Sequence, residues 1–249
     1  MKKIILLNKK EGETPLEALE NFRKKNSEYL KVPMTYAGRL DPIASGILLI
    51  LAGEETKNKE EYLAQDKEYN FQVLFGFNTD TYDILGKVVS SKNIVLSKKE
   101  LENKIKNNIK TFIGKSIQEY PIYSSKTVKG KPLFTYARSG EEVEIPKREI
   151  IIKKLELEKI SKIDNKKLLK NIEKRIKRVK GDFRQKEILK IWTKELHLLN
   201  KQLFYVANLK IKCSSGTYVR NIANSIGVNI GIPALAFSIR RIKIGKYTL

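Results

Sequence analysis

The sequence feature that most constrains the fold is a glycine-bounded loop that runs directly into an apolar segment. Residues 36–50 read Tyr-Ala-Gly-Arg-Leu-Asp-Pro-Ile-Ala-Ser-Gly-Ile-Leu-Leu-Ile. Because Asp41 precedes a proline, its backbone is expected to be extended rather than helical. Gly38 and Gly46 allow the chain to bend sharply on either side of it. The apolar run 47–50 predicts a buried segment that fixes this loop to the core.

The residues around Asp41 allow two interpretations. An acid on a loop that is held by a core element is typical of a catalytic carboxylate. The simpler alternative is a turn in which the Asp41 side chain hydrogen-bonds to its own backbone. Turn statistics favour this alternative slightly when the spacing is considered alone, so the rest of the chain has to decide between them.

Hydrophobic patterns predict both strands and helices along the chain. Strands are expected at 3–8, 67–77, 149–158, 203–213 and 237–244, where apolar, aromatic or β-branched residues cluster or alternate. Two capping boxes predict helix starts, one at Thr14 and one at Ser97. The first helix is expected to run to about Lys25, and the second is expected to stop before Gly114.

Two further helical periods lie between the strands expected at 149–158 and 203–213. The first contains Leu168, Leu169, Ile172, Ile176 and Val179, and the second contains Ile188, Trp192, Leu196 and Leu199. They predict a helical hairpin inserted at 160–201. Residues 161–200 hold 13 Lys and Arg against 5 Asp and Glu. This surplus fits equally well a solvated outer face or an RNA-binding arm.

The charge of the whole chain favours an anionic partner. Fifty Lys and Arg exceed 28 Asp and Glu, which gives a net charge of +22. A charge of this size attracts a polyanion such as nucleic acid, although a general lysine excess also maintains solubility. An anionic membrane is less favoured, because no basic run is joined to a large amphipathic anchor.

Composition also restricts disulfides, metals and targeting signals. Cys213 is the only cysteine, so no intramolecular disulfide can form, and its place on the apolar face of its strand predicts a core residue. One histidine and one cysteine far apart in the sequence do not supply a four-ligand zinc site. The apolar run near the N-terminus is too short for a signal peptide, so a cytoplasmic location is expected.

The segment 38–46, Gly-Arg-Leu-Asp-Pro-Ile-Ala-Ser-Gly, closely resembles the catalytic motif of the TruB family of tRNA pseudouridine synthases. More of the family pattern follows in the same order. The matching blocks are Lys67 with Tyr69, Gly76 to Gly86 with its Thr79-Asp80-Thr81 core, Pro121 to Lys126 with Gly130, Tyr136 to Arg138 with Gly140, Ser214 to Arg220, and Arg240-Arg241. The resemblance covers most of 1–160 and 203–249, and so many ordered blocks are not expected by coincidence.

This resemblance implies a fold and a reaction. The fold class is α+β: a mixed, mostly antiparallel sheet flanked by helices, forming a single catalytic domain with the basic hairpin inserted. The reaction is the isomerisation of uridine 55 in the tRNA T-loop to pseudouridine. The implied partner is the T-arm of tRNA. No metal, nucleotide or redox cofactor, no membrane and no obligate protein partner is expected, and the family default is a monomer.

The resemblance also implies which residues form the site. Asp41 is the catalytic residue, Tyr69 stacks on the target base, and Arg220 pairs with the carboxylate and so favours its charged form in a partly dry pocket. Asp41 acts either as a nucleophile at C1′ or as the base that removes the C2′ proton. Further substrate-binding residues are expected at Tyr36, Gly38, Arg39, Lys67, Thr79, Asp80, Lys126 and Tyr218. Without the family, Tyr69 reads as a strand aromatic and Arg220 as a surface cation.

Three departures from the family pattern stand out. Tyr36 occupies the position where the family usually has a histidine. The N-terminal pattern of the family appears as Lys9 to Pro15 without its usual proline and serine. The C-terminal PUA domain of many members is not expected, and the hairpin at 160–201 is expected to compensate for it in part.

Two other functions remain as alternatives. One is a pseudouridine synthase that acts on a different RNA site. The other is a tRNA-binding or tRNA-folding chaperone whose catalysis is incidental or lost. The joint presence of Asp41, Tyr69 and Arg220 argues against the second, since a binding module does not need them together.

Overall fold

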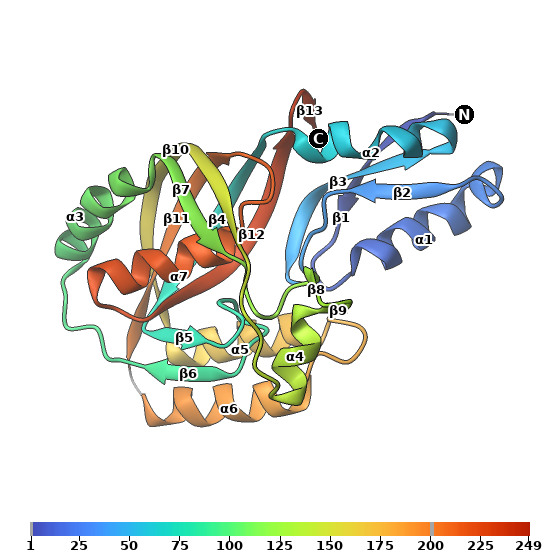
Figure 1. Ribbon diagram of the computed structural model, residues 1–249. Coiled ribbons are helices and arrows are strands. Elements are labelled where there is room, and N and C mark those ends of the chain that lie inside the picture. Colours follow the sequence, from blue (N-terminus) through green and yellow to red (C-terminus); the bar gives the residue numbers. More distant parts are fainter. Residues whose placement is uncertain (1, 200–201) are drawn as a thin grey trace.

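The computed structural model describes residues 2–199 and 202–249. It is built on a nine-stranded sheet in the order β1-β3-β12-β4-β11-β10-β7, with β13 beside β12 and β2 beside β3 (Figure 1). The strands are β1 Ile4–Lys9, β2 Met34–Ala37, β3 Ala44–Ala52, β4 Lys67–Phe75, β7 Gly114–Glu119, β10 Lys147–Asp164, β11 Leu203–Cys213, β12 Ala234–Ile244 and β13 Tyr247–Thr248. The described strand pairs of this sheet are antiparallel except β3 with β12. The expected mixed, mostly antiparallel α+β fold is therefore confirmed.

Helices and short strands surround this sheet. The helices are α1 Pro15–Lys25, α2 Lys59–Ala64, α3 Lys98–Ile109, α4 Leu133–Ser139, α5 Asn165–Ile176, α6 Gln185–Leu198 and α7 Val219–Ile230. Two small sheets pair β5 Phe77–Thr79 with β6 Val88–Ser91, and β8 Thr127–Val128 with β9 Lys131–Pro132. Both capping boxes are present, with the Thr14 and Ser97 side chains accepting from the backbone N–H of Glu17 and Glu100.

Helices α3 and α7 cover one face of the sheet (Figure 1). Leu101 and Ile105 of α3 join Ile222 and Ile226 of α7 in a core with the inner residues of β4, β10 and β11. Cys213 belongs to the same core, as expected, and burial raises the pKa of its thiol to about 12. This layer fixes the start of α7, from which Arg220 projects.

The inserted hairpin is present, and it packs against the domain as part of its core. It connects β10 to β11, and its helices start at Asn165 because β10 continues to Asp164. Trp192 of α6 is fully buried, with its ring centroid 5.0 Å from that of Phe77, and its Nε1–H donates to the Ile84 carbonyl at 3.2 Å. Residues 200 and 201 of the expected range lie outside the described residues.

Several strand boundaries differ from the sequence expectation. The strand expected at 67–77 breaks at Gly76, whose φ of +108° turns Phe77 into the separate β5–β6 pair. Strand β10 extends beyond 149–158 in both directions, and β12 begins three residues before 237. The four-residue β2 was not predicted, because its half-buried residues carry no strong alternation.

The N-terminal strands form a layer that carries α1 and joins the rest of the sheet through β3. Strand β3 pairs with β12 over three residues only, including Arg241 opposite Gly46. Within β3, residues 47–51 are completely buried, which confirms the buried segment expected after the Asp41 loop. The loop therefore leads directly into the joint between the two parts of the sheet.

Candidate functional site

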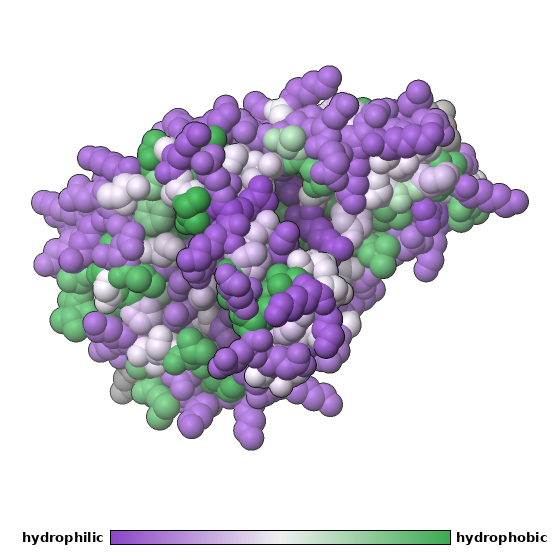
Figure 2. Space-filling model, in the orientation of Figure 1, coloured by the Kyte–Doolittle hydropathy of each residue, from purple (hydrophilic) through white to green (hydrophobic). Residues whose placement is uncertain are grey.

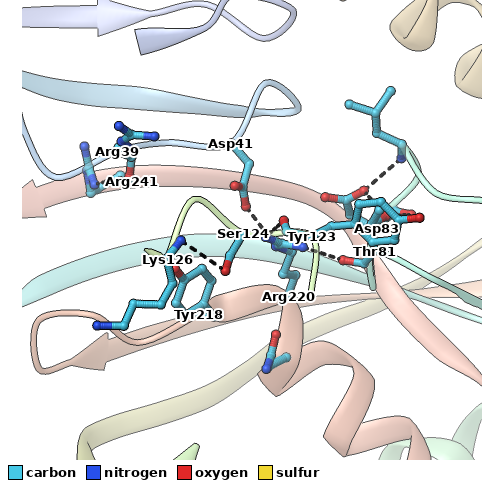
Figure 3. A network of polar contacts seen from close by, with 12 residues as sticks. Arg39, Asp41, Thr81, Asp83, Tyr123, Ser124, Lys126, Tyr218, Arg220 and Arg241 are labelled. Atoms are coloured by element: carbon cyan, nitrogen blue, oxygen red, sulfur yellow. Dashed lines mark hydrogen bonds and ion pairs between the residues drawn. The ribbon is translucent and has the colours of Figure 1, made fainter. Parts of the chain in front are cut away.

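Asp41 lies in the turn between β2 and β3. Its backbone carbonyl accepts from Ala44 N at 2.9 Å, and the following Pro42 carbonyl accepts from Gly12 N at 2.8 Å. The side chain is directed at Arg220 rather than at its own turn (Figure 3). This geometry disfavours the interpretation of Asp41 as a simple turn residue, because the carboxylate is presented to a partner from another element.

Arg241 of β12 holds the Asp41 loop in place. Its guanidinium donates to the carbonyls of Ile47 at 2.8 Å, Gly38 at 3.0 Å and Arg39 at 3.3 Å, and the side chain is fully buried. Gly46 makes this approach possible: at its φ of +102°, a Cβ atom would lie 2.1 Å from the Arg241 carbonyl oxygen. The loop is thus held by β12, a strand that follows it by almost 200 residues in the sequence.

Lys9 supports the other side of the loop. Its ammonium group donates to the carbonyls of Glu13 at 2.6 Å, Lys10 at 3.0 Å and Pro42 at 3.5 Å. Burial lowers its pKa to about 8, although Glu13 and Asp41 act against this shift. The sequence showed Lys9 only as part of an N-terminal pattern, and its contact with Pro42 could not be read from that pattern.

Arg220 is the centre of the polar network. Its Nε lies 3.0 Å from Asp41 Oδ2, Nη1 donates to the Thr81 carbonyl at 2.8 Å, and Nη2 donates to the Tyr123 carbonyl at 2.9 Å. The Nε contact is an ion pair without the alignment of a hydrogen bond. Arg220 is 2% exposed, whereas the Asp41 side chain is 38% exposed. A fixed internal cation therefore faces a carboxylate that solvent, or a substrate, can reach.

Asp83 adds a second carboxylate to this network. Its Oδ1 accepts from Thr81 Oγ1 at 2.8 Å and from Leu85 N at 2.9 Å. Burial raises the pKa of Asp83 to about 6, and the Arg220 charge opposes that rise. The pKa of Arg220 is itself raised: burial works against its charge, but Asp41 and Asp83 outweigh that effect. One buried arginine is thus shared by two acids.

Two expected aromatic residues lie next to this network. Tyr69 of β4 is buried directly opposite Arg241 in the sheet register, and burial raises its pKa. Tyr218 lies beside Arg220, with the guanidinium carbon 5.6 Å from its ring centroid, and its pKa is also raised by burial. The charge of Asp41 adds to the rise of both pKa values, so both tyrosines lie within reach of its electrostatic influence (Figure 3 shows Tyr218).

Three other expected residues reach solvent around the loop. Arg39 is exposed, with its guanidinium carbon 6.0 Å from the half-buried Tyr36 ring. Lys126 is exposed beside Tyr120, 5.3 Å from that ring centroid. Figure 2 shows the surface hollowed between the α7 side of the molecule and the β1–β3 layer, with hydrophilic residues lining the hollow. Exposed cations such as Arg39 and Lys126 can contact phosphates.

The remaining expected residues are engaged inside the protein. Lys67 donates to the carbonyls of Leu63 and Gln65 at 2.5 Å each, and burial lowers its pKa to about 8. Thr79 is fully buried and donates to the Asp83 carbonyl at 2.7 Å. Asp80 forms an ion pair with Arg184 at 2.7 Å. As placed here, these three residues support the loops around the site, and their polar groups are occupied by protein partners.

The described residues contain no group of three or more His, Cys, Asp or Glu side chains that could hold a metal ion. Within the same residues, no helix is long and apolar enough to cross a bilayer. What the arrangement can do chemically is present one reachable carboxylate that forms an ion pair with a buried arginine. Such a group can act as a nucleophile or as a base.

Comparisons with known proteins give one consistent set of relatives. The model of the TruB family pseudouridylate synthase (N terminal domain) matches residues 27–181. The chain is 31% identical over its whole length to tRNA pseudouridine synthase B of Caldicellulosiruptor saccharolyticus, of which it covers 69%. It is likewise 31% identical to the enzyme of that name from Fusobacterium nucleatum, of which it covers 70%. Over 86% of the chain it is 34% identical to that of Caldanaerobacter subterraneus, of which it covers 60%.

Solved structures support the fold. A Cbf5-Nop10-Gar1 complex contains a chain that superposes with a TM-score of 0.56 at 17% identity. That match covers 98% of this chain and 49% of the other. An H/ACA RNP bound to a substrate RNA containing 2′-deoxyuridine gives a TM-score of 0.54 at 16% identity, covering 98% of this chain and 48% of that chain.

Proposed function

This chain belongs to the TruB family of tRNA pseudouridine synthases, and we propose that it isomerises uridine 55 of the tRNA T-loop at the carboxylate of Asp41. The observation that carries the assignment of Asp41 is its ion pair with the buried Arg220, because this pair sets a carboxylate that solvent can reach beside a fixed internal cation. The relatives it matches are named tRNA pseudouridine synthase B. We propose the T-arm of tRNA as the partner, with a monomeric chain acting in the cytoplasm.

The chemistry requires an ionised carboxylate close to C1′ of the target nucleotide. The N1–C1′ bond breaks, the uracil rotates, C5 bonds to C1′ and loses its proton, and N1 gains a proton, so that the product is an isomer of the substrate. In one route Asp41 attacks C1′ and is later displaced by C5. In the other it removes the C2′ proton and returns a proton there after C5 has bonded. Both routes begin from the charged form of Asp41, whose Oδ2 lies 3.0 Å from Arg220 Nε.

The substrate has to enter the hollow with its base out of the stack. Loop nucleotides are cheaper to unstack than paired ones, which favours a tRNA loop over a duplex. An aromatic face such as that of Tyr69 holds a flipped base with about 1–3 kcal/mol. In this proposal, the exposed cations Arg39 and Lys126 bind phosphates of the RNA loop.

The first prediction is that Asp41→Asn abolishes pseudouridine formation while tRNA binding persists. The measurement is pseudouridine mapping of unmodified tRNA transcripts after incubation with each protein. Asp66→Asn is the matched control, since Asp66 pairs with Lys153 outside the network and its replacement should leave the activity unchanged.

The outcomes of this mapping separate the candidate functions. Pseudouridine at position 55 with wild type and control only would support both the substrate and the role of Asp41. Modification at another uridine would retain the chemistry and replace the substrate. Tight tRNA binding without any modification would favour the chaperone instead.

A further inference from the structure

The turn of the inserted hairpin delivers an arginine toward the site. Arg184 stands at the start of α6 with φ +62° and ψ 26°, a left-handed conformation that is uncommon for a residue other than glycine. Its backbone N–H donates to Asp182 Oδ1 at 3.1 Å, and the Gln185 amide donates to the carbonyls of Val179 and Gly181. The turn is therefore held by several contacts at once, which is the condition for such a conformation to persist.

The Arg184 side chain binds two loops. Its guanidinium forms a fork on Asp80, with Nη1 at 2.7 Å from Oδ2 and Nη2 at 3.3 Å from Oδ1. Nη1 also donates to the Tyr123 hydroxyl at 2.7 Å, and the guanidinium carbon lies 4.2 Å from the Tyr123 ring centroid. One arginine thus fastens the loop at 79–86, through Asp80, to the loop at 120–126, through Tyr123.

Arg220 binds the same two loops through their backbone. It donates to the carbonyl of Thr81, which follows Asp80 in the first loop, and to the carbonyl of Tyr123 in the second. The two loops are therefore joined twice, by Arg220 from α7 and by Arg184 from the hairpin turn. Figure 3 shows Tyr123 and Thr81 next to the Arg220 guanidinium that faces Asp41.

We propose that Arg184 is a positioning residue, which fixes the carbonyls of Thr81 and Tyr123 and through them holds Arg220 in register with Asp41. The inference rests on the proposed function, because it concerns the geometry of the same site. It gives the inserted hairpin a share in catalysis that does not require contact with RNA. A shift of about 1 Å in a catalytic group can lower a rate by about 10²-fold.

The competing role for Arg184 is a direct contact with an RNA phosphate. Its contacts argue against this, because Nη1 already serves two acceptors and Nη2 serves Asp80. The side chains of Arg184 and Asp80 are only 16% and 20% exposed, and the Asp80 carboxylate neutralises the arginine. A neutralised and stacked guanidinium offers little to a phosphate, so its contribution should appear in the rate of the reaction rather than in affinity.

The test compares single-turnover rates and tRNA dissociation constants for Arg184→Gln and Lys186→Gln. Lys186 is the matched control, since it lies two residues away, is exposed, and makes no ion pair with any described residue. We expect Arg184→Gln to lower the single-turnover rate at saturating enzyme at least about 10-fold. We expect its dissociation constant to stay within about twofold of the Lys186→Gln value.

Two further variants separate positioning from mere charge. Arg184→Lys keeps the charge but removes the fork and the stacking, so it should restore only part of the rate. Asp80→Asn combined with Arg184→Gln should reduce the rate no more than the worse single variant, because both changes break one contact. All rates are measured under conditions where urea unfolding shows each variant to be folded. Tyr123→Phe is a milder variant, because it removes only the hydroxyl that accepts from Arg184.

A rate for Arg184→Gln equal to that of Lys186→Gln would overturn the proposal. An effect confined to the dissociation constant, or additive effects with Asp80→Asn, would overturn it too and would favour the phosphate contact. Any uridine that the wild type modifies serves as the readout. The failure of position 55 as the target is therefore distinguishable from the failure of Arg184 as a positioning residue.

Discussion

At the residue scale, buried arginines are the main structural supports of the site. Arg220 and Arg241 both bind backbone carbonyl oxygens, and Arg220 also pairs with the Asp41 carboxylate. Both arginines are almost fully buried. A guanidinium suits this role because its five N–H donors are fixed in one plane and its charge cannot be removed by burial. Although the chain has a net charge of +22, these two cations therefore bind groups of the protein itself and stabilise the fold.

Removing the Arg220 charge should cost more stability than removing an exposed one. Arg220→Met is expected to lower the free energy of unfolding by about 3–5 kcal/mol, because Asp83 would remain buried without a neutralising charge. The measurement is urea unfolding followed by circular dichroism. Arg39→Met, on the exposed surface of the Asp41 loop, is the control and should stay within about 0.5 kcal/mol of wild type. Equal decreases in the two variants would contradict the role given to Arg220.

The raised pKa of Asp83 predicts a pH dependence of stability. In the folded chain the Asp83 carboxyl keeps its proton up to about pH 6, whereas the ordinary pKa of an aspartate side chain is 3.8. The stability that Asp83 contributes is therefore fully present below about pH 4 and is lost as the pH rises through 6. Relative to Asp83→Asn, the unfolding free energy of wild type should fall by about 3 kcal/mol between pH 4 and 7. A difference that stays constant with pH would show that Asp83 titrates normally.

At the element scale, the inserted hairpin has an inner and an outer face. The inner face fills a core with Phe77, Ile84 and Leu235 from the rest of the domain. The outer face carries two rows of exposed lysines, Lys166, Lys170 and Lys174 on α5 and Lys190 and Lys194 on α6. Deleting the hairpin would therefore expose a core as well as remove charge, so the two faces need separate tests.

The inner face is tested by Trp192→Ala. The variant should lower the unfolding free energy by about 3–5 kcal/mol, since it leaves a cavity beside Phe77 and deprives the Ile84 carbonyl of its donor. Leu198→Ala on the same helix is the control, because that side chain is 70% exposed. If urea unfolding gave both variants the same stability, the hairpin would be an appendage rather than part of the core.

The outer face is tested by replacing these five exposed lysines with glutamine. None of them forms an ion pair with a described residue, so they are free to meet phosphates, and stability should change little. We expect weaker tRNA binding and a shallower dependence of affinity on salt, by about 0.7–0.9 in the logarithmic slope for each lysine that binds a phosphate in the wild type. Variants of each row alone would show which helix faces the RNA. An unchanged slope would leave the outer face as a solvated surface.

How far the sequence predicted these elements depended on the strength of the local signal. Capping boxes and helical periods located α1, α3 and the hairpin within a few residues, since those signals are contained in one segment. Boundaries failed where a tertiary contact decided them, as at Gly76, whose N–H donates to the Pro233 carbonyl. The short β2 is stabilised by its pairing with β3 and has no strong pattern of its own.

At the scale of the whole molecule, the site is assembled from segments far apart in the chain. The motif around Asp41 and the arginine at 220 could be named from sequence, because their patterns match a family. The support given by Lys9 and Arg184 could not, since each contacts the site through a fold that brings distant loops together. Lys67, Thr79 and Asp80 were expected to bind substrate, but the sequence could not show that each contacts another group of the protein.

The place of β12 in the sheet has a consequence for synthesis of the protein. This strand lies between β3 and β4 and carries Arg241, yet it is made about 200 residues after the loop that it holds. On the ribosome, the Asp41 loop of a nascent chain therefore lacks its contacts with Arg241 until β12 has left the exit tunnel. Fragments from interrupted translation therefore carry Asp41 without the contacts that hold its loop in the complete fold.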